Sequence, residues 1–364
     1  MNLLDPTADL EGRHEDWRLT LSSPALARRA PTMQDVAALA QVSTKTVSRV
    51  VNGQSTVSPD IARRVQDAIR MLDYHPNMAA ISLRRADRKT STIGLLLEDV
   101  ANPFSSALHR AVEDTAIRHG MLVFAGSGDE DPDREGEVLA AFVSHQVDGL
   151  IVVPAGGHWD RLFVEQQRQG TPVILVDRLV EFLDADSVTA DNRAGALDAV
   201  RHLAAHGHRR IAFLGDARSI WTARERQAGY AEGLLAEGIP YDPSLVRQDF
   251  PTIELAEGAA IDLLALADPP TALFTAQNLI TVGAIRALRQ RGLQHRVALI
   301  GFDDLMLAEI LDPAISVVAQ DPRALGRTAA ELLLARLAGD RGPSRHVVMP
   351  TRLVMRGSGE IPAP

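Results

Sequence analysis

The residues best suited to chemistry are four polar side chains in one short segment, Thr44, Lys45, Ser48 and Arg49. Their spacing places them on one face of a helix, while the valines among them fall on the opposite face. Arginine and lysine can donate hydrogen bonds to guanine O6 and N7, and serine and threonine can donate to a base or a phosphate. The segment therefore predicts contacts with nucleic acid. A helical hairpin with a solvated polar face is the alternative.

The elements that must position these side chains are short helices between residues 32 and 76. Apolar spacing indicates helices over residues 34–40 and 44–51, with the turn Gln41-Val42-Ser43 between them. Ser58 and Pro59 then mark the start of a third helix, as its N-cap and first-turn proline. A tight turn between two helices can place the second helix in the major groove of DNA. The pattern predicts a helix-turn-helix headpiece.

Charge is distributed unevenly between this segment and the rest of the chain. Residues 31–90 contain nine Lys and Arg against five Asp and Glu, whereas the whole chain of 364 residues has a net charge of −9. The segment therefore has a net charge of +4. Subtracting this from the net charge of the whole chain, −9, leaves −13 for the remainder. A basic head on an acidic body directs a polyanion to one end of the molecule.

From residue 92 onward, apolar strand-like runs alternate with amphipathic helical stretches. The runs lie at residues 92–97, 121–125, 149–153, 173–176, 210–214, 272–275 and 298–301, and helical stretches at 103–118, 191–205, 224–237 and 279–291. Such alternation is typical of parallel sheets covered by helices on both faces. About ten such units exceed what one sheet usually holds. The sequence therefore predicts two similar α/β lobes whose facing strand ends form a cleft.

Composition and motifs argue against several other classes of protein. The chain has no cysteine, which rules out disulfides and thiol chemistry, and no run of about 20 apolar residues that would indicate a membrane span. It lacks a Gly-x-Gly-x-x-Gly fingerprint, a phosphate loop, a nucleophile elbow and a His-Glu-x-x-His pair, so an enzyme is the weaker interpretation and no cofactor or metal is expected. A transport-type solute-binding protein would share the lobes but would need an export signal, which the first 30 residues do not resemble. We expect a cytoplasmic protein.

The headpiece segment resembles the DNA-binding headpiece of the lactose-repressor (LacI/GalR) family of transcription regulators. The resemblance rests on Asp35-Val36-Ala37, Val42-Ser43 and the run from Thr46 to Asn52, while Gln41 stands where the family commonly has glycine. It implies a sequence-specific regulator, more often a repressor, that binds double-stranded operator DNA as a homodimer, with a tetramer as the alternative. The DNA contacts that the resemblance implies are Thr32, Ser43, Thr44, Lys45, Ser48, Arg49, Asn52, Tyr74, Asn77, Ala80, Leu83 and Arg84.

The segment that follows the headpiece resembles the hinge of this family. The resemblance implies a short helix that forms only when two subunits pair on DNA, with Leu83 entering the minor groove and wedging a base step open. A helix of eight residues is marginal alone, and an apolar wedge can kink DNA when added contacts offset the unstacking. A solvated basic linker is the alternative.

The resemblance extends to about residue 358 and implies that the two lobes have the type I periplasmic-binding-protein fold. Its landmarks include Asn102-Pro103-Phe104, Val176-Asp177-Arg178 and Gly301-Phe302-Asp303-Asp304. Paired carboxylates, a planar guanidinium and aromatic faces suit a sugar or sugar derivative, although each residue could instead be purely structural. The effector contacts that the resemblance implies are Phe104, Asp191, Thr222, Arg226, Phe250, Gln277 and Asp303.

One departure from the family concerns the charge of the cleft. Gln277-Asn278 stands where relatives usually have Asn-Asp, which removes one carboxylate. A sugar acid or a phosphate is therefore a further hypothesis for the ligand.

The sequence thus predicts an α/β protein with four segments. They are a disordered tail (residues 1–31), a three-helix headpiece (32–76), a hinge helix and linker (77–91), and a two-lobed effector-binding and dimerisation domain with parallel sheets (92–364). The expected function is operator binding controlled by a small carbohydrate-like effector in the interlobe cleft. Whether the effector releases DNA or strengthens binding is left open.

Overall fold

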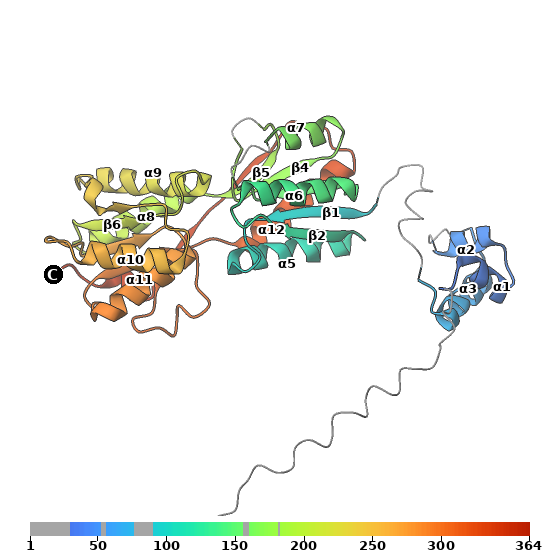
Figure 1. Cartoon of the computed structure of the whole chain (residues 1–364), viewed down its shortest axis with the longest axis horizontal. Coiled ribbons are helices and arrows are strands. Elements are labelled where there is room, and N and C mark those ends of the chain that lie inside the picture. Colours follow the sequence, from blue (N-terminus) through green and yellow to red (C-terminus); the bar gives the residue numbers. More distant parts are fainter. Residues whose placement is uncertain (1–29, 52–55, 76–89, 156–159, 181–182) are drawn as a thin grey trace, which may run out of the picture. The chain divides into compact units, whose positions relative to one another are not determined.

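The computed structural model describes residues 30–51, 56–75, 90–155, 160–180 and 183–364. The chain divides into two compact units between Arg88 and Lys89 (Figure 1). The predicted tail up to residue 29 and the predicted hinge over residues 77–89 lie outside the described residues. The two units are a small helical headpiece and a larger α/β sensor domain.

The headpiece consists of α1 (Met33–Leu39), α2 (Thr44–Val51) and α3 (Pro59–Leu72) around a small apolar core. One valine from each helix, Val36, Val47 and Val65, is fully buried at its centre. The first helix starts at a capping box, because Thr32 N donates to the Asp35 carboxylate (2.7 Å) and Asp35 N donates back to Thr32 Oγ1 (3.4 Å). The buried valines hold the three helices together, and the capping box fixes where α1 begins.

The turn between α1 and α2 contains a left-handed residue at Gln41, where the family commonly has glycine. Gln41 has φ +52°, in the region that favours glycine. A side chain there costs up to about 1 kcal/mol. The turn nevertheless forms, and Arg64 of α3 stabilises it by donating to the Ala40 carbonyl at 2.6 Å.

The first lobe of the sensor domain contains a parallel sheet in the order β11-β5-β4-β3-β1-β2. Helices α5 and α12 cover one face and α6 and α7 cover the other (Figure 1). The strands are β1 (Thr92–Leu97), β2 (Leu122–Ser127), β3 (Gly149–Val152), β4 (Val173–Val176), β5 (Asp186–Ala190) and β11 (His346–Met349), and the helices α5 (Pro103–Arg118), α6 (Pro132–Ser144), α7 (Asp160–Arg168) and α12 (Pro322–Leu337).

The second lobe repeats this plan, with the order β12-β10-β9-β8-β6-β7 and only β12 antiparallel to its neighbour. Helices α8 and α9 cover one face, and α10 and α11 cover the other (Figure 1). The strands are β6 (Ile211–Leu214), β7 (Val246–Arg247), β8 (Ala272–Thr275), β9 (Ala298–Phe302), β10 (Ser316–Ala319) and β12 (Arg352–Val354), and the helices α8 (Asn192–Ala205), α9 (Trp221–Ala236), α10 (Ile253–Leu264) and α11 (Asn278–Arg291). The chain crosses between the lobes after β5, β10 and β11.

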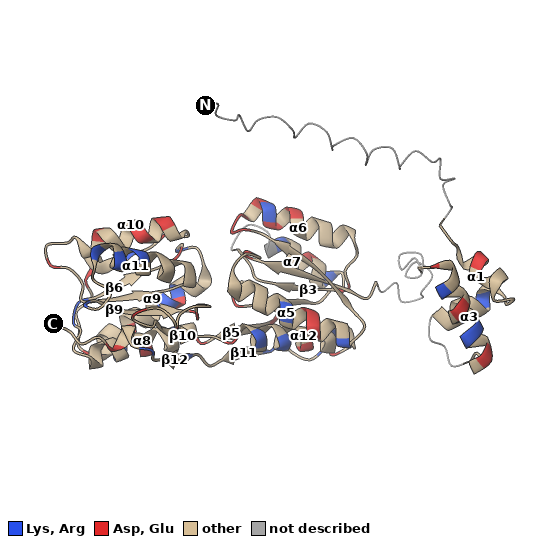
Figure 2. Ribbon diagram, turned by 90° about the horizontal axis from the view of Figure 1, so that it is seen from below, with Lys and Arg blue, Asp and Glu red and all other residues tan. Residues whose placement is uncertain are grey.

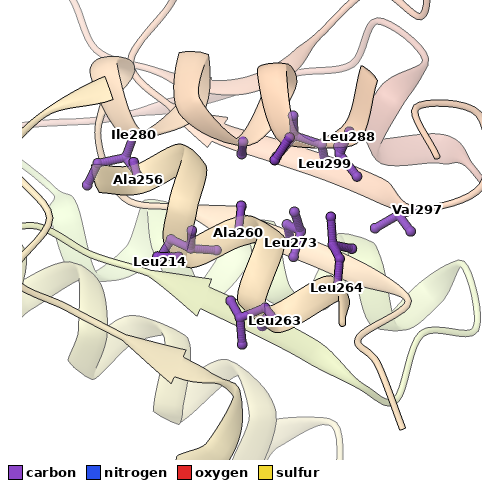
Figure 3. Close-up of a cluster of buried hydrophobic side chains, with 14 of the residues drawn as sticks. Leu214, Ala256, Ala260, Leu263, Leu264, Leu273, Ile280, Leu288, Val297 and Leu299 are labelled. Carbon is purple, nitrogen blue, oxygen red and sulfur yellow. The ribbon is translucent and has the colours of Figure 1, made fainter. Parts of the chain in front are cut away.

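The core of the second lobe shows how its helices are held on the sheet. Side chains of α10 and α11, among them Leu263, Ile280 and Leu288, pack with Leu273 of β8 (Figure 3). On the outer surface, acidic residues of α10 lie beside arginines of α11 (Figure 2), and Arg286 approaches the Glu254 carboxylate at 3.4 Å. Apolar contacts inside and ion pairs outside fix α11, whose first turn reaches the cleft described below.

Candidate nucleic-acid interface and ligand cleft

The outer face of α2 carries the polar residues that the sequence places there. Thr44, Lys45 and Arg49 are exposed, Ser48 is half-buried, and Val47 is fully buried on the opposite side. Ser43 has a local role, because its Oγ accepts a hydrogen bond from Thr46 N at 3.1 Å and so caps the start of the helix. The helix therefore presents the exposed side chains of Lys45 and Arg49 from a position that the headpiece core holds.

The structure corrects one predicted DNA contact and leaves several outside its description. Tyr74 is only 8% exposed and packs in the headpiece core, because its ring covers the end of the small apolar cluster. Thr32 caps α1 through its side chain. The remaining predicted contacts lie outside the described residues: Asn52, Asn77, Ala80, Leu83 and Arg84.

A cleft between the two lobes brings together five of the seven predicted effector contacts. Its lining includes Phe104, Thr222, Arg226, Gln277 and Asp303. These residues come from the first turn of α5, the first two turns of α9 and the positions just after β8 and β9. The cleft thus lies at the carboxyl ends of the parallel strands, where ligands of open α/β sheets bind.

Asp191 and Phe250, the other two predicted contacts, are not part of this lining. Asp191 is the N-cap of α8, and its carboxylate accepts a hydrogen bond from Ala194 N at 3.1 Å. Phe250 is half-buried and packs against the apolar cluster of the second lobe beneath α10 and α11. Both are structural in this arrangement.

Six further polar or charged residues line the cleft that were not chosen as contacts from the sequence: Glu98, Asn102, Asp177, Arg178, Asp216 and Gln320. Asn102, Asp177 and Arg178 belong to landmark motifs, but Glu98, Asp216 and Gln320 belong to none. What these residues share is their position in the fold, because each follows the carboxyl end of a strand. Pairing strand ends across two lobes would have been needed to find them.

Arg226 organises the second lobe's side of the cleft. Its guanidinium donates to the Asn192 side chain at 2.8 Å and to the Ala276 carbonyl at 2.7 Å, and lies 3.7 Å from the Asp303 carboxylate. It also stacks 3.9 Å from the centroid of the Phe302 ring. Gln320 donates to the other oxygen of Asp303 at 2.5 Å. Helix α9 is thereby tied to α8 and to the ends of β8 and β9.

Arg178 and Glu98 dominate the first lobe's side. Arg178 forms a bidentate ion pair with Glu130, at 2.8 and 2.5 Å. Glu98 accepts a hydrogen bond from Ser105 Oγ, while its other carboxylate oxygen has no hydrogen-bond partner among the described residues. Burial raises the pKa of Glu98 to about 7, although Arg178 opposes this effect. Burial also raises the pKa of Asp177 and of Asp216.

Asn278 links the two lobes rather than setting the charge of the cleft. Its side-chain amide donates to Asn102 Oδ1 at 2.8 Å, which joins the start of α11 to the start of α5. The cleft lining retains the carboxylates of Glu98, Asp177, Asp216 and Asp303. Asn278 therefore does not make the cleft poor in carboxylates, because the chain supplies acids at other strand ends.

Within the described segments, no three or more His, Asp or Glu side chains are grouped so as to hold a metal ion. Across the same segments, no helix combines the length and apolar character needed to cross a membrane.

Comparisons with known proteins identify both units. A family described as bacterial regulatory proteins, lacI family, matches residues 32–77, and a periplasmic binding protein-like domain matches residues 200–359. The transcriptional repressor CytR of Escherichia coli K12 is 32% identical over 332 residues, covering 90% of this chain and 96% of CytR. The transcriptional regulator PtxS of Pseudomonas aeruginosa is 36% identical over 336 residues, covering 91% and 96%.

Solved structures agree with these matches. A lac repressor dimer bound to operator and the anti-inducer ONPF has a TM-score of 0.81 and 26% identity, covering 91% of this chain and 99% of that one. A complex of the transcriptional regulator CelR with cellobiose has a TM-score of 0.68 and 31% identity, covering 90% and 99%. These matches confirm the predicted fold. They also confirm the prediction that the protein is a transcriptional regulator rather than an enzyme. The chain belongs to the lacI family of bacterial regulatory proteins.

Proposed function

We propose that this protein is a cytoplasmic transcriptional repressor that binds operator DNA as a homodimer under the control of a small polyhydroxylated effector. The observation that carries the proposal is the outer face of α2, where Lys45 and Arg49 project from a helix held rigidly by the headpiece core. A helix so presented fits the major groove. The effector would bind in the cleft between Arg226 and Arg178.

The cleft offers a means of control because both lobes contribute to it. The Asn102–Asn278 hydrogen bond joins the two lobes. The Asp303–Gln320 hydrogen bond lies where the chain crosses from the second lobe to the first. A ligand that binds one lobe arrangement more tightly than another shifts the population of the two. Such a shift in a dimer would change the spacing of the two headpieces.

The experiment that tests the proposal is selection of bound sequences from random duplex DNA, repeated with a panel of carbohydrates and their derivatives. A pseudo-palindromic consensus whose enrichment changes with one compound would support it. Equal binding to all duplexes under every condition would reject it.

We expect Arg49→Ala to lower affinity for the selected operator by about 1–3 kcal/mol while affecting nonspecific duplex much less, because a base contact carries sequence information. Competition binding at fixed salt measures both affinities. Arg70→Ala is the matched control, because Arg70 is an exposed arginine of the same headpiece that pairs with Asp67. An equal loss of affinity for both duplexes would mean that Arg49 contacts a phosphate and not a base.

The proposed dimer has a candidate surface on the sensor domain, which we call the apolar strip: Ile117 of α5, Leu122 and Phe124 of β2, and Met306, Leu307 and Ile310 after β9. Met306 is 88% exposed and Ile310 77% exposed. Strand β2 is also the edge of its sheet, with one side unpaired. A monomer rarely exposes so many large apolar side chains, and a second copy of the chain would cover them.

The double variant Met306→Asp, Ile310→Asp is expected to sediment as a monomer at micromolar concentration, because two carboxylates would be buried without partners in the dimer. Sedimentation velocity measures the mass. Leu235→Asp is the control, since Leu235 of α9 is 80% exposed but lies outside the apolar strip. A double variant with the mass of the unmodified protein would exclude this surface.

A further inference from the structure

The acids of the cleft occupy equivalent positions in the two lobes. Glu98 and Asp216 each come shortly after the strand at the same place in its sheet, and their carbonyl groups accept hydrogen bonds from Asp129 N (2.6 Å) and Asp249 N (3.2 Å). Asp177 and Asp303 follow β4 and β9, where their N–H groups donate to Val188 and Val318, both at 2.9 Å. The repeated fold thus directs two carboxylates from each lobe into one cleft.

Positive charge in the cleft does not balance these acids. Of the described residues that line it, Arg178 and Arg226 are the basic ones. Arg178 forms a bidentate pair with Glu130, and its Nε also lies 3.7 Å from the Asp177 carboxylate. The two arginines therefore face five carboxylates, those of Glu130, Glu98, Asp177, Asp216 and Asp303. Burial disfavours the charged forms of Glu98, Asp177 and Asp216 and raises their pKa, so a bound cation would favour their ionised forms.

The unsatisfied hydrogen-bonding groups point to the same kind of ligand. Among the described residues that line the cleft, four buried acceptor atoms lack a partner: Glu98 Oε2, Asp177 Oδ1, Gln277 Oε1 and Gln320 Oε1. Against them stands one donor without a hydrogen bond, Arg178 Nε, which lies 3.7 Å from the Asp177 carboxylate. Glu98 and Asp177 are only 6% and 5% exposed, so water serves them poorly. Buried acceptors without donors destabilise the unliganded cleft, and an ammonium group supplies three donors with a positive charge.

We propose that the ligand of this cleft is a polyhydroxylated amine whose ammonium group pairs with the Glu98 and Asp177 carboxylates. Its hydroxyl groups donate to Gln277, Gln320 and Asp303, and Phe104 covers an apolar face. The inference rests on the proposed function, since it names the chemical class of the effector. It disfavours sugar acids and phosphates, whose charge would oppose four carboxylates.

Three achiral probes test the charge preference without requiring the stereochemistry of the natural ligand. They are tris(hydroxymethyl)aminomethane, a cation at neutral pH; pentaerythritol, its neutral analogue with a fourth hydroxymethyl group; and the anion 2,2-bis(hydroxymethyl)propionate. Each is titrated into the full-length protein to about 100 mM in amine-free buffer, with calorimetry and the melting temperature as readouts. We expect the amine to bind at least about ten-fold more tightly than pentaerythritol, and the anion most weakly. Equal affinities, a preference for the anion, or no binding of the amine would overturn the proposal.

Two conservative variants locate the effect. Glu98→Gln and Asp177→Asn should each reduce the preference for the amine over pentaerythritol by about ten-fold, whereas Glu137→Gln, at an exposed position of α6, should retain it. Unfolding curves establish that each variant is folded, and if either folds poorly the other carries the test. A folded variant with the unmodified preference would refute the pairing. Operator selection on the same unmodified preparation separates the two claims: sequence-specific DNA binding without a preference for the amine rejects only the ligand class.

Discussion

Gly229→Ala is expected to lower the free energy of unfolding of the sensor domain by about 2 kcal/mol, because α8 and α9 cross with almost no space between them. A Cβ at Gly229 would lie 2.2 Å from the Arg193 carbonyl oxygen and 2.9 Å from Ala196 Cβ, both on α8. The backbone of a helix cannot yield by that amount without moving the helix. The gain in helix propensity, about 1 kcal/mol, offsets only part of the steric cost. Urea denaturation followed by circular dichroism measures the change.

Gly258→Ala is the matched control, since Gly258 lies within α10 and a Cβ there would meet no atom within 4 Å. It should stabilise the protein by up to about 1 kcal/mol. The comparison bears on function, because the Arg226–Asn192 hydrogen bond joins the same two helices at the cleft. If both variants behave alike, close packing of α8 and α9 does not hold the cleft in shape.

The elements that the sequence predicts well are those whose signals are local. Strand β1 and helix α5 have the predicted bounds, because a continuous apolar run ends just before the Asn102 N-cap and Pro103. Strand β5 was not predicted, because its residues Asp186, Ser187 and Thr189 are polar although they are buried. Asp186 is satisfied by Arg336 and Arg345, about 150 residues away, and no local pattern contains that information.

The same distinction between local and long-range signals explains which parts of the candidate site could be predicted from the sequence. The α2 face follows from helical periodicity alone, and its exposed and buried sides agree with the prediction. The cleft depends on which strand ends face each other across two lobes, so Glu98 and Asp216 have no signal in their own neighbourhoods. Tyr74 was predicted to contact DNA, and the burial of its ring had no signal in the sequence because it depends on how α3 ends against the headpiece core.

The Asp186 cluster holds the C-terminal strand β11 to the first lobe. The Asp186 side chain is fully buried and accepts two hydrogen bonds from the Arg336 guanidinium, at 2.7 and 2.8 Å. Arg345, next to β11, donates from its backbone N–H (2.7 Å) and its guanidinium (3.0 Å). Burial alone would raise the pKa of Asp186, but these hydrogen bonds outweigh it and hold the pKa at about 2.

Asp186→Asn is therefore expected to lower the free energy of unfolding by about 3–5 kcal/mol at neutral pH, because two arginines lose their buried counter-ion. Since the folded-state pKa lies below the ordinary value of 3.8, the stabilisation is complete above about pH 5 and is lost as the pH falls towards 2. The difference between the unmodified protein and the variant should accordingly shrink over that range in urea denaturation at several pH values. Asp184→Asn, at an exposed carboxylate two residues away, should change stability little at any pH. A loss in Asp186→Asn that did not depend on pH would mean that packing of the side chain, rather than its charge, holds β11 in place.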